Sequence, residues 1–218
     1  MKTVEFYYVR HGETLFNVLD KMQGWCDSPL TENGIKDAER AHDILKDIPL
    51  TKAYTSTSER CRDTCALVLK GRNVPVFETK GLKEINFGTF EAIQQSSHMD
   101  EIGPRRQALH WEDVGGDSYE TFSTRIRNAF QKINDECEDG DHVLIVSHGA
   151  VWLWMQKIIL GLDMETFRKT KEEKGLPMMP NGYNGTFVCE DGVFRLTGIP
   201  GMTKEEVAAM YERNDGNE

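Results

Sequence analysis

The 218-residue sequence predicts an α/β fold of three layers, α/β/α, in which helices cover both faces of a largely parallel central sheet. Short apolar segments of strand length alternate along the chain with longer segments whose apolar residues recur every three or four positions. No internal repeat, low-complexity segment or linker-like change of composition interrupts this alternation. We therefore expect a single domain over residues 1–213, followed by a frayed tail over 214–218.

The first half of the chain contains three of the expected strands. They cover Val4–Val9, Lys52–Thr55 and Val74–Thr79. One helix is expected from Thr31, a favourable N-cap residue, to about Lys46. A second is expected to begin in the segment from Ser56 to Glu59, which has capping-box spacing, and to end near Lys70.

The second half begins with residues 92–117, which show little periodicity and many polar residues. We expect them to form a lid-like excursion over the functional site, whose residues are named below, rather than part of the core. A helix follows, and then a strand, a buried helix, two short strands and a last helix. The first of these helices has Phe122, Ile126, Phe130 and Ile133 on its apolar face. The strand is expected at His142–Val146, the buried helix at Ala150–Leu160 and the two short strands at Thr186–Cys189 and Val193–Leu196. The last helix is expected to begin near Lys204. The charged run Lys169–Lys174 is expected to be a solvated helix face.

Charge and composition limit the partners of this protein. Lysine and arginine number 26 against 36 aspartates and glutamates, so the net charge is −10. Such an acidic surface argues against nucleic acid or an anionic membrane, whereas a small anionic substrate needs only a local group of arginines. The five cysteines form no CxxC pair, and neither a signal-peptide pattern nor an apolar run of transmembrane length is present. These features favour a cytoplasmic protein and leave the oligomeric state open.

Two strand ends carry the same pair of residues. Arg10-His11-Gly12 follows the first strand, and Ser147-His148-Gly149 follows a later one. The carboxyl ends of parallel strands meet at one rim of a sheet, so both histidines are expected there. Arg60, in the first turn of another helix, is expected at the same rim. Two imidazoles and two guanidinium groups would together surround a tetrahedral dianion.

This combination resembles the histidine phosphatase superfamily, often called phosphoglycerate mutase-like. The matching residues are Arg10, His11, Gly12 and Glu13, then Asn17, Arg60 with Thr64, Glu84 in Leu82–Gly88, and His148 with Gly149. The resemblance implies that His11 is the nucleophile, with Glu84 as proton donor and acceptor. It further implies that Arg10, Arg60, His148, Asn17 and a backbone N–H near Gly149 hold the phosphoryl group. No metal or other cofactor is implied.

The implied reaction also sets physical requirements. His11 must be neutral to attack, which requires one ring nitrogen to donate to the backbone while the other faces phosphorus. The acid needs a raised pKa. Glu91 competes with Glu84 for the acid role, and Arg62 competes with Arg60. Asn184 is a further candidate for substrate contact, although it could equally be an ordinary turn asparagine.

The resemblance leaves two enzymatic activities open. The Phe87-Gly88 pair after Glu84 is similar to the phosphatase branch, which favours hydrolysis of a small phosphorylated metabolite. Gln23 and Gly24 are shared with the mutases, so a cofactor-dependent phosphoglycerate mutase is the alternative. The pair Arg105 and Arg106 resembles the substrate-binding arginines of mutases, and we expect one of the two to contact the distal part of the substrate. A non-catalytic phospho-ligand-binding module is a third possibility.

Overall fold

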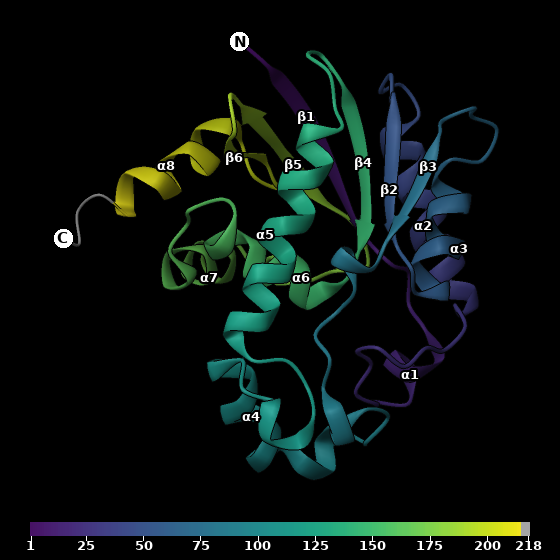
Figure 1. Cartoon of the computed structure of the whole chain (residues 1–218), viewed down its shortest axis with the longest axis vertical. Helices are drawn as coiled ribbons and strands as arrows, with labels where there is room; N and C mark the ends of the chain where they lie inside the picture. The colour runs from purple at the N-terminus through teal and green to yellow at the C-terminus, as the bar shows by residue number, and fades with distance from the viewer. Residues whose placement is uncertain (215–218) are drawn as a thin grey trace.

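A computed structural model describes residues 1–214, with a six-stranded sheet in the order β3-β2-β4-β1-β5-β6 at its centre (Figure 1). The strands are β1 Thr3–Arg10, β2 Lys52–Ser56, β3 Val76–Thr79, β4 His142–Ser147, β5 Gly182–Glu190 and β6 Val193–Gly198. The four strands β3, β2, β4 and β1 pair in parallel, whereas β5 is antiparallel to both β1 and β6. The predicted largely parallel sheet is confirmed.

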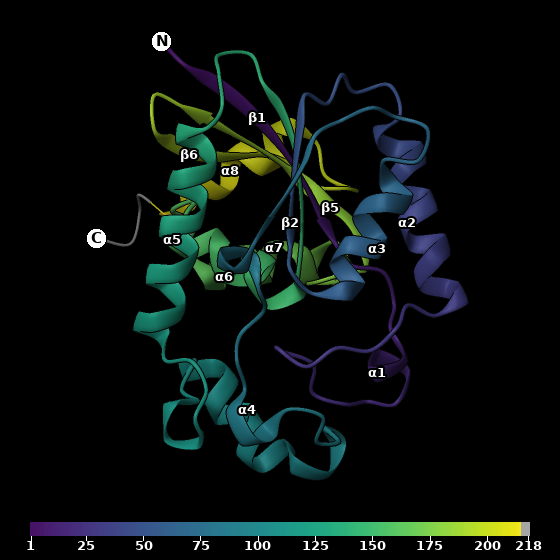
Figure 2. The same cartoon turned by 45° about the vertical axis from the view of Figure 1, so that its right-hand side comes forward.

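Helices cover both faces of this sheet. They are α1 Leu15–Val18, α2 Glu32–Leu45, α3 Glu59–Val68, α4 Met99–Ala108, α5 Tyr119–Asp135, α6 Gly149–Ile158, α7 Met164–Glu173 and α8 Lys204–Asn214. Helices α2 and α3 pack on one face, and α5 and α6 pack on the other (Figures 1 and 2). The N-caps Thr31 and Ser118 each accept a backbone N–H of the following helix. The three-layer architecture is therefore confirmed.

Strand β1 shows why the central segments are apolar throughout. Phe6 and Tyr8 point into the hydrophobic cluster under α5 and α6, while Tyr7 and Val9 point into the cluster under α2 and α3. Successive strand residues face opposite sides of a sheet, so a strand covered on both sides needs apolar residues at every position. Packing on both faces thus holds the end of β1 at Arg10, directly before His11.

The expected start of α3 was two residues too early. Ser56 is the last residue of β2, and Ser58 is the N-cap, without a side-chain capping bond. The hydroxyl of Ser56 lies instead 2.8 Å from Nε2 of His148, so it serves the site rather than a capping box. Strand β3 is also shorter than expected, because its pairing with β2 begins only at Val76.

The excursion over residues 92–117 differs from the expectation in one respect. It contains α4 and short 3-10 turns, and its Ile102, Leu109 and Trp111 are fully buried, so it contributes to the core. Gly103 and Pro104 lie inside α4 and interrupt the helical pattern that would have revealed it. With α1, the excursion lies beyond the end at which β4 finishes (Figure 1).

The charged run in α7 is only partly solvated. Lys169 and Glu172 are exposed as expected, but Lys171 is buried. Its Nζ lies 5.5 Å from the centroid of the Phe167 ring and 3.4 Å from the carbonyl oxygen of Met178. Burial lowers the pKa of this amine to about 8.

Two expectations concern the chain as a whole. Asn214, placed in the expected frayed tail, is the last residue of α8, and residues 215–218 lie outside the described part of the chain. Within residues 1–214, no helix is both long enough and apolar enough to cross a membrane.

Candidate active site

The two histidines meet at the carboxyl end of the sheet, as the sequence predicts. Arg10 of β1 is in register with Ser147 of the parallel strand β4, and the backbone N–H of His11 donates to the Ser147 carbonyl at 3.0 Å. The imidazole rings of His11 and His148 lie edge to face, with centroids 5.4 Å apart. Strand pairing therefore brings together residues separated by more than half the chain.

His11 has the protonation state that an attacking imidazole requires. Its Nδ1 lies 2.9 Å from the carbonyl oxygen of Gly12, which only accepts, so Nδ1 carries the hydrogen and Nε2 keeps its lone pair. Burial, together with the charges of Arg60 and Arg10, lowers the pKa of His11 well below its ordinary value of 6.5. His11 is thus a neutral imidazole of fixed tautomer, which is the state that nucleophilic attack requires.

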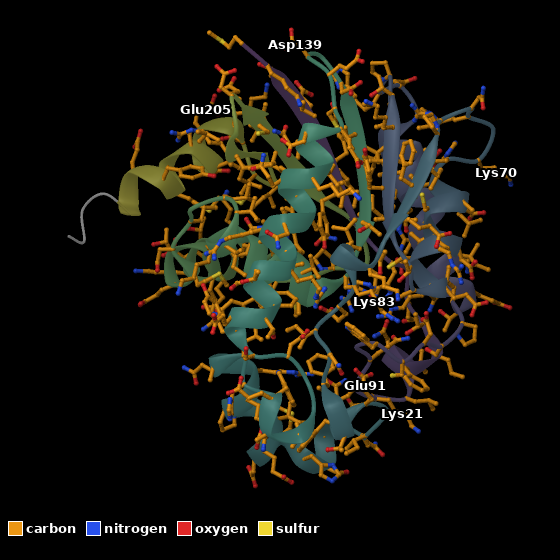
Figure 3. All side chains as sticks on the ribbon, in the orientation of Figure 1. Lys21, Lys70, Lys83, Glu91, Asp139 and Glu205 are labelled. Atoms are coloured by element: carbon orange, nitrogen blue, oxygen red, sulfur yellow. The ribbon has the colours of Figure 1, made fainter. Side chains whose placement is uncertain are left out.

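A cavity of about 250 Å³ opens beside His11. It is lined by Arg10, His11, Asn17, Lys21, Gln23, Glu84, Ile85, Phe87, Gln95, Arg106, Gly149, Ala150, Leu153, Trp154 and Met179. Seven of these are residues that the sequence singled out for the site: Arg10, His11, Asn17, Gln23, Glu84, Arg106 and Gly149. Lys21 reaches it from the segment after α1, beside the excursion (Figure 3).

Glu84 has the environment of a general acid. Its carboxyl group is buried in the cavity wall, and its two oxygens accept the backbone N–H groups of Ile85 and Ala150, both at 3.0 Å. Burial raises the pKa of Glu84 above 4.5, against the opposing effect of these hydrogen bonds. The competitor Glu91 is fully engaged elsewhere. Its carboxylate accepts the backbone N–H groups of Gly24, Trp25, Cys26 and Phe87.

Arg10 presents a buried donor that lacks a partner. Its terminal amino group donates to the carbonyl of Met179, but its Nε–H has no acceptor. This Nε lies 3.1 Å from the point that a Cβ on Gly149 would occupy, at the start of α6. Asn17 accepts the N–H of Thr14 through Oδ1 at 3.1 Å, which leaves its amide N–H groups for the cavity. Unpaired buried donors at one cavity suit an anionic oxygen.

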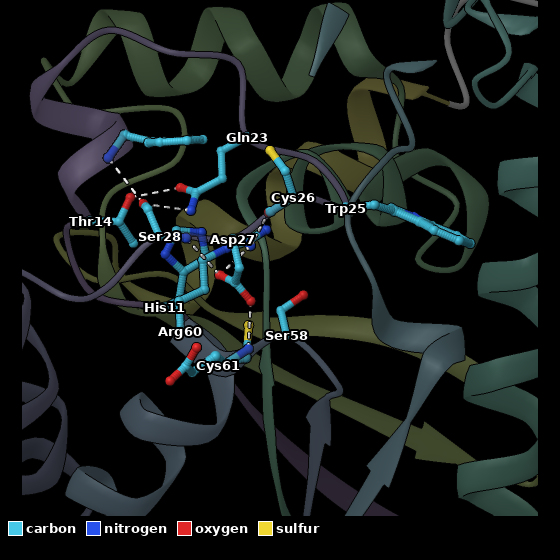
Figure 4. Close-up of polar contacts among 12 residues, drawn as sticks. His11, Thr14, Gln23, Trp25, Cys26, Asp27, Ser28, Ser58, Arg60 and Cys61 are labelled. Atoms are coloured by element: carbon cyan, nitrogen blue, oxygen red, sulfur yellow. Dashed lines mark hydrogen bonds and ion pairs between the residues drawn. The ribbon is translucent and has the colours of Figure 1, made fainter. Parts of the chain in front are cut away.

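Arg60 and His148 lie behind His11 and do not line the cavity. Arg60 donates to the carbonyls of Gly24 and Cys26, to Asp27 at 2.8 Å and to Nδ1 of His148 at 2.9 Å (Figure 4). Because a guanidinium group has no acceptor, Nδ1 of His148 is unprotonated and its Nε2–H donates to Ser56. In this conformation the unpartnered Nε–H of Arg60 is its one donor left for phosphate.

Burial and nearby positive charge also set the state of His148. They lower the pKa of His148 well below 6.5, with Arg60 the largest contributor after burial. The alternative arginine, Arg62, is half exposed and pairs with Glu78 at 3.7 Å on the surface, whereas Arg60 is buried beside His148.

Three predicted substrate contacts, Gly24, Arg105 and Asn184, do not line the cavity. The carbonyl of Gly24 holds Arg60, and its N–H is held by Glu91. Arg105 pairs with Asp113 at 2.5 Å outside the cavity, so Arg106 is the member of that pair which lines it. Asn184 is a buried residue of β5 that donates to the carbonyls of Pro180 and Gly182 and does not line the cavity.

Sequence reasoning missed other residues of the site. Asn181 donates to the backbone carbonyl of His11 at 2.7 Å, three positions before the asparagine that was singled out. Trp154, which lies in the segment Ala150–Leu160 expected to form a buried helix, lines the cavity. Gln95 and Lys21 also line it, and no motif in the sequence marks them. Among residues 1–214, no group of three or more histidine, cysteine, aspartate or glutamate side chains is arranged to hold a metal ion.

Known proteins share both this sequence pattern and this fold. The family model of the histidine phosphatase superfamily (branch 1) matches residues 6–175. The chain is 30% identical over 192 residues to 2,3-bisphosphoglycerate-dependent phosphoglycerate mutase 2 of Gloeobacter violaceus, covering 82% of this chain and 86% of that protein. It is 33% identical over 153 residues to the adenosylcobalamin/alpha-ribazole phosphatase of Salmonella typhimurium, covering 68% and 75%.

The crystal structure of a phosphoglycerate mutase from Bacillus anthracis superposes with a TM-score of 0.74 at 28% identity, covering 96% of this chain and 97% of that one. These relatives include both phosphatases and mutases, so they narrow the enzyme class to those two activities. The match of the family model over most of the chain, with the cavity around His11, shows that this protein belongs to branch 1 of the histidine phosphatase superfamily.

Proposed function

We propose that this protein is a metal-independent phosphatase that hydrolyses a small phosphomonoester through a phosphohistidine intermediate on His11, in the cytoplasm. One observation carries the proposal. A neutral imidazole with a free Nε2 shares a small cavity with Glu84, a buried carboxyl group of raised pKa, and with Arg10, a cation that has an unpaired N–H. This supplies a nucleophile, an acid and a group that stabilises the phosphoryl charge.

In the first step, Nε2 of His11 attacks phosphorus and forms the N–P bond. The ester P–O bond breaks, and its electron pair leaves with the alcohol oxygen, which takes the proton of Glu84. Arg10, the amide of Asn17 and the N–H of Gly149 in the first turn of α6 hold the phosphoryl oxygens. The attack and the proton transfer thus involve different side chains of the same cavity.

In the second step, water hydrolyses the phosphohistidine. Glu84, now a carboxylate, takes a proton from the water while the water oxygen bonds to phosphorus. The N–P bond breaks, its electron pair returns to Nε2 of His11, and inorganic phosphate leaves. The two steps restore both residues to their starting protonation states.

The shape of the cavity favours hydrolysis over mutase activity. It shares Arg106, Leu153 and Trp154 with a surface groove of about 960 Å³ between α4, α6 and α7. The alcohol can leave along this groove and water can enter, whereas a mutase must retain its substrate until the phosphoryl group is returned. Phosphoglycerate mutase activity is the second candidate, because the Gloeobacter and Bacillus relatives carry that name.

Phosphate release from p-nitrophenyl phosphate in the presence of EDTA tests the proposal, with conversion of 3-phosphoglycerate measured in parallel. We expect turnover by the wild type, none by His11→Ala and a strong reduction by Glu84→Ala. Interconversion of phosphoglycerates that outpaces phosphate release would establish the mutase instead. Inactivity on every ester with retained phosphate binding would indicate a binding module.

A further inference from the structure

We infer that the natural substrate is a phosphomonoester whose alcohol carries an aromatic ring, held between Trp154 and Arg106, and a polar far end that lies in the groove between α4 and α7. The inference rests on the proposed function and names the substrate class of the same site. It comes from the walls of the cavity away from His11.

Those walls are mostly apolar. Their large apolar side chains are Ile85, Phe87, Leu153, Trp154 and Met179, which lie beside the polar Lys21, Gln23, Gln95 and Arg106. A phosphorylated three-carbon acid is polar over its whole length and would leave these side chains in contact with water or with hydroxyl groups. An aromatic ring would cover them and gain the free energy of burial. The composition of the cavity therefore favours an alcohol with a large apolar part.

Trp154 stands at the junction of the two spaces. Its side chain is half-buried, lines both the cavity and the groove, and is held edge to face by Tyr119 with ring centroids 5.6 Å apart. The partner ring fixes the indole without filling the cavity. A ring of the substrate that lies on this indole would have its phosphate directed towards His11 and its other end towards the groove.

Arg106 also lines both the cavity and the groove, at the same junction as Trp154. It donates to Oε1 of Gln95 and contacts Sδ of Met22 at 3.1 Å, and within residues 1–214 it forms no ion pair. Gln95 is fixed in turn, because its backbone N–H donates to the carbonyl of Asp20 at 2.8 Å. A planar guanidinium group without a carboxylate partner is suited to stack on an aromatic ring.

The groove beyond the junction has a mixed charge. Its lining includes Lys157, Arg168, Lys169, Asp163, Glu165 and Glu172. A hydroxylated or charged end of a substrate would find hydrogen-bond partners of both signs there, whereas a purely aliphatic tail would not. The aromatic part of the substrate is therefore expected at Trp154 and its polar part further out.

Paired esters with similar leaving groups test this inference. The substrates are 2-phenylethyl phosphate and ethyl phosphate, which both release a primary alcohol. We expect the wild type to favour the phenyl ester in kcat/KM by at least about tenfold. Trp154→Ala should remove most of that preference through KM, and Trp154→Phe should retain it. Arg106→Lys, which keeps the charge but loses the planar group, should reduce the preference partially.

A matched control and a binding measurement separate this inference from the proposed function. Phe77→Ala removes an exposed aromatic side chain from the edge strand β3 and should leave both esters unaffected. Binding of 2-phenylethylphosphonate and ethylphosphonate, measured by calorimetry, requires no turnover and should show the same dependence on Trp154. Equal affinity for the two phosphonates in the wild type, or an equal effect of Trp154→Ala on both, would overturn the inference even if phosphatase activity is found. Inactive enzyme with a preserved phenyl preference in binding would overturn only the proposed function.

Discussion

Nη2 of Arg60 lies 2.9 Å from Nδ1 of His148, and this contact determines which nitrogen of the second histidine carries the hydrogen. The Nε2–H of His148 then donates to Ser56. Arg60 is itself held by the segment from Gly24 to Asp27, so a loop, two strand ends and a helix form one buried hydrogen-bond network. The network fixes the neutral His148 against the face of His11.

Ser56→Ala should expose the dependence of the site on this network. The substitution leaves the buried Nε2–H of His148 with only Sγ of Cys61, a weak acceptor 3.5 Å away, which costs about 1–3 kcal/mol of unfolding free energy. Urea unfolding should show that loss, together with a lower kcat. Thr57→Ala, the adjacent hydroxyl residue, is the matched control and should change neither quantity appreciably. Equal effects of the two substitutions would show that the Ser56 contact contributes nothing specific.

The rate should be highest at mildly acidic pH. The active form contains neutral His11 and protonated Glu84. Burial lowers the pKa of His11 well below 6.5 and raises that of Glu84 above 4.5, so acid protonates His11 only at low pH. As the pH rises, Glu84 loses its proton and kcat/KM should fall.

The pH profile of Glu84→Gln on p-nitrophenyl phosphate provides the comparison. The leaving group of this ester needs little protonation, so the variant should retain some activity. The decrease in its rate with rising pH that comes from ionisation of Glu84 should be absent. The ionisation of the ester itself, near pH 6, affects both enzymes equally. An optimum above pH 8, or identical profiles for the two enzymes, would contradict the assignment of the acid.

Gly149→Ala should disturb Arg10. The new Cβ would lie 3.1 Å from Nε of Arg10 and 3.3 Å from its Cζ, which is tight enough to displace the guanidinium group. Because small displacements in a phosphoryl site are costly, we expect kcat/KM to fall by about 10- to 100-fold with the fold retained. Gly103→Ala in α4 meets no atom within 4 Å and serves as the control on p-nitrophenyl phosphate. Similar rates for both variants would exclude a tight phosphate contact by Arg10.

Asn181→Ala should lower kcat more than it raises KM. The side chain donates to the backbone carbonyl of His11 at 2.7 Å and does not itself line the cavity, so its loss should loosen His11 rather than the substrate. A reduction of about tenfold in kcat is expected, because a small shift of the imidazole weakens its alignment with phosphorus. Asn128→Ala, an exposed asparagine on α5, should behave like the wild type. A pure KM effect would instead indicate substrate contact.

Ala92→Gly should stabilise the protein slightly. Ala92 has φ of 64°, in the left-handed region that residues with a Cβ disfavour, and its N–H donates to the carbonyl of Met22 at 2.9 Å. Relief of that strain, of about 1–2 kcal/mol, outweighs the greater freedom of glycine in the unfolded chain. Thermal unfolding should show a small increase in Tm, and a decrease would mean that the backbone relaxes without cost.

Much of the fold, and the meeting of the two histidines, followed from local sequence. The residues at strand ends, Arg10-His11-Gly12 and Ser147-His148-Gly149, met because parallel pairing places such ends together. The core of the excursion was missed because Gly103 and Pro104 interrupt the helical pattern that Ile102 and Leu109 would otherwise show. Pattern alone did not reveal that Lys171 is buried.

The distal part of the site could not be predicted for a different reason. Trp154 is one residue in an apolar helix, and only the packing of α6 against its neighbours shows that its side chain reaches the cavity. The engagement of Arg105 by Asp113, and of Glu91 by four backbone N–H groups, likewise depends on tertiary contacts. Residue type made Arg105 and Glu91 candidates alongside Arg106 and Glu84. Their hydrogen-bond partners in the folded protein show that Arg105 and Glu91 are engaged away from the cavity.

Rapid alkaline quench of the enzyme during turnover of p-nitrophenyl phosphate, followed by mass spectrometry of its peptides, tests the phosphohistidine mechanism most directly. The mechanism predicts one phosphoryl group on His11, absent in His11→Ala and more abundant in Glu84→Ala, where hydrolysis of the intermediate is slower than its formation. Steady turnover without any phosphorylated His11 peptide, or with the phosphoryl group on another residue, would contradict it.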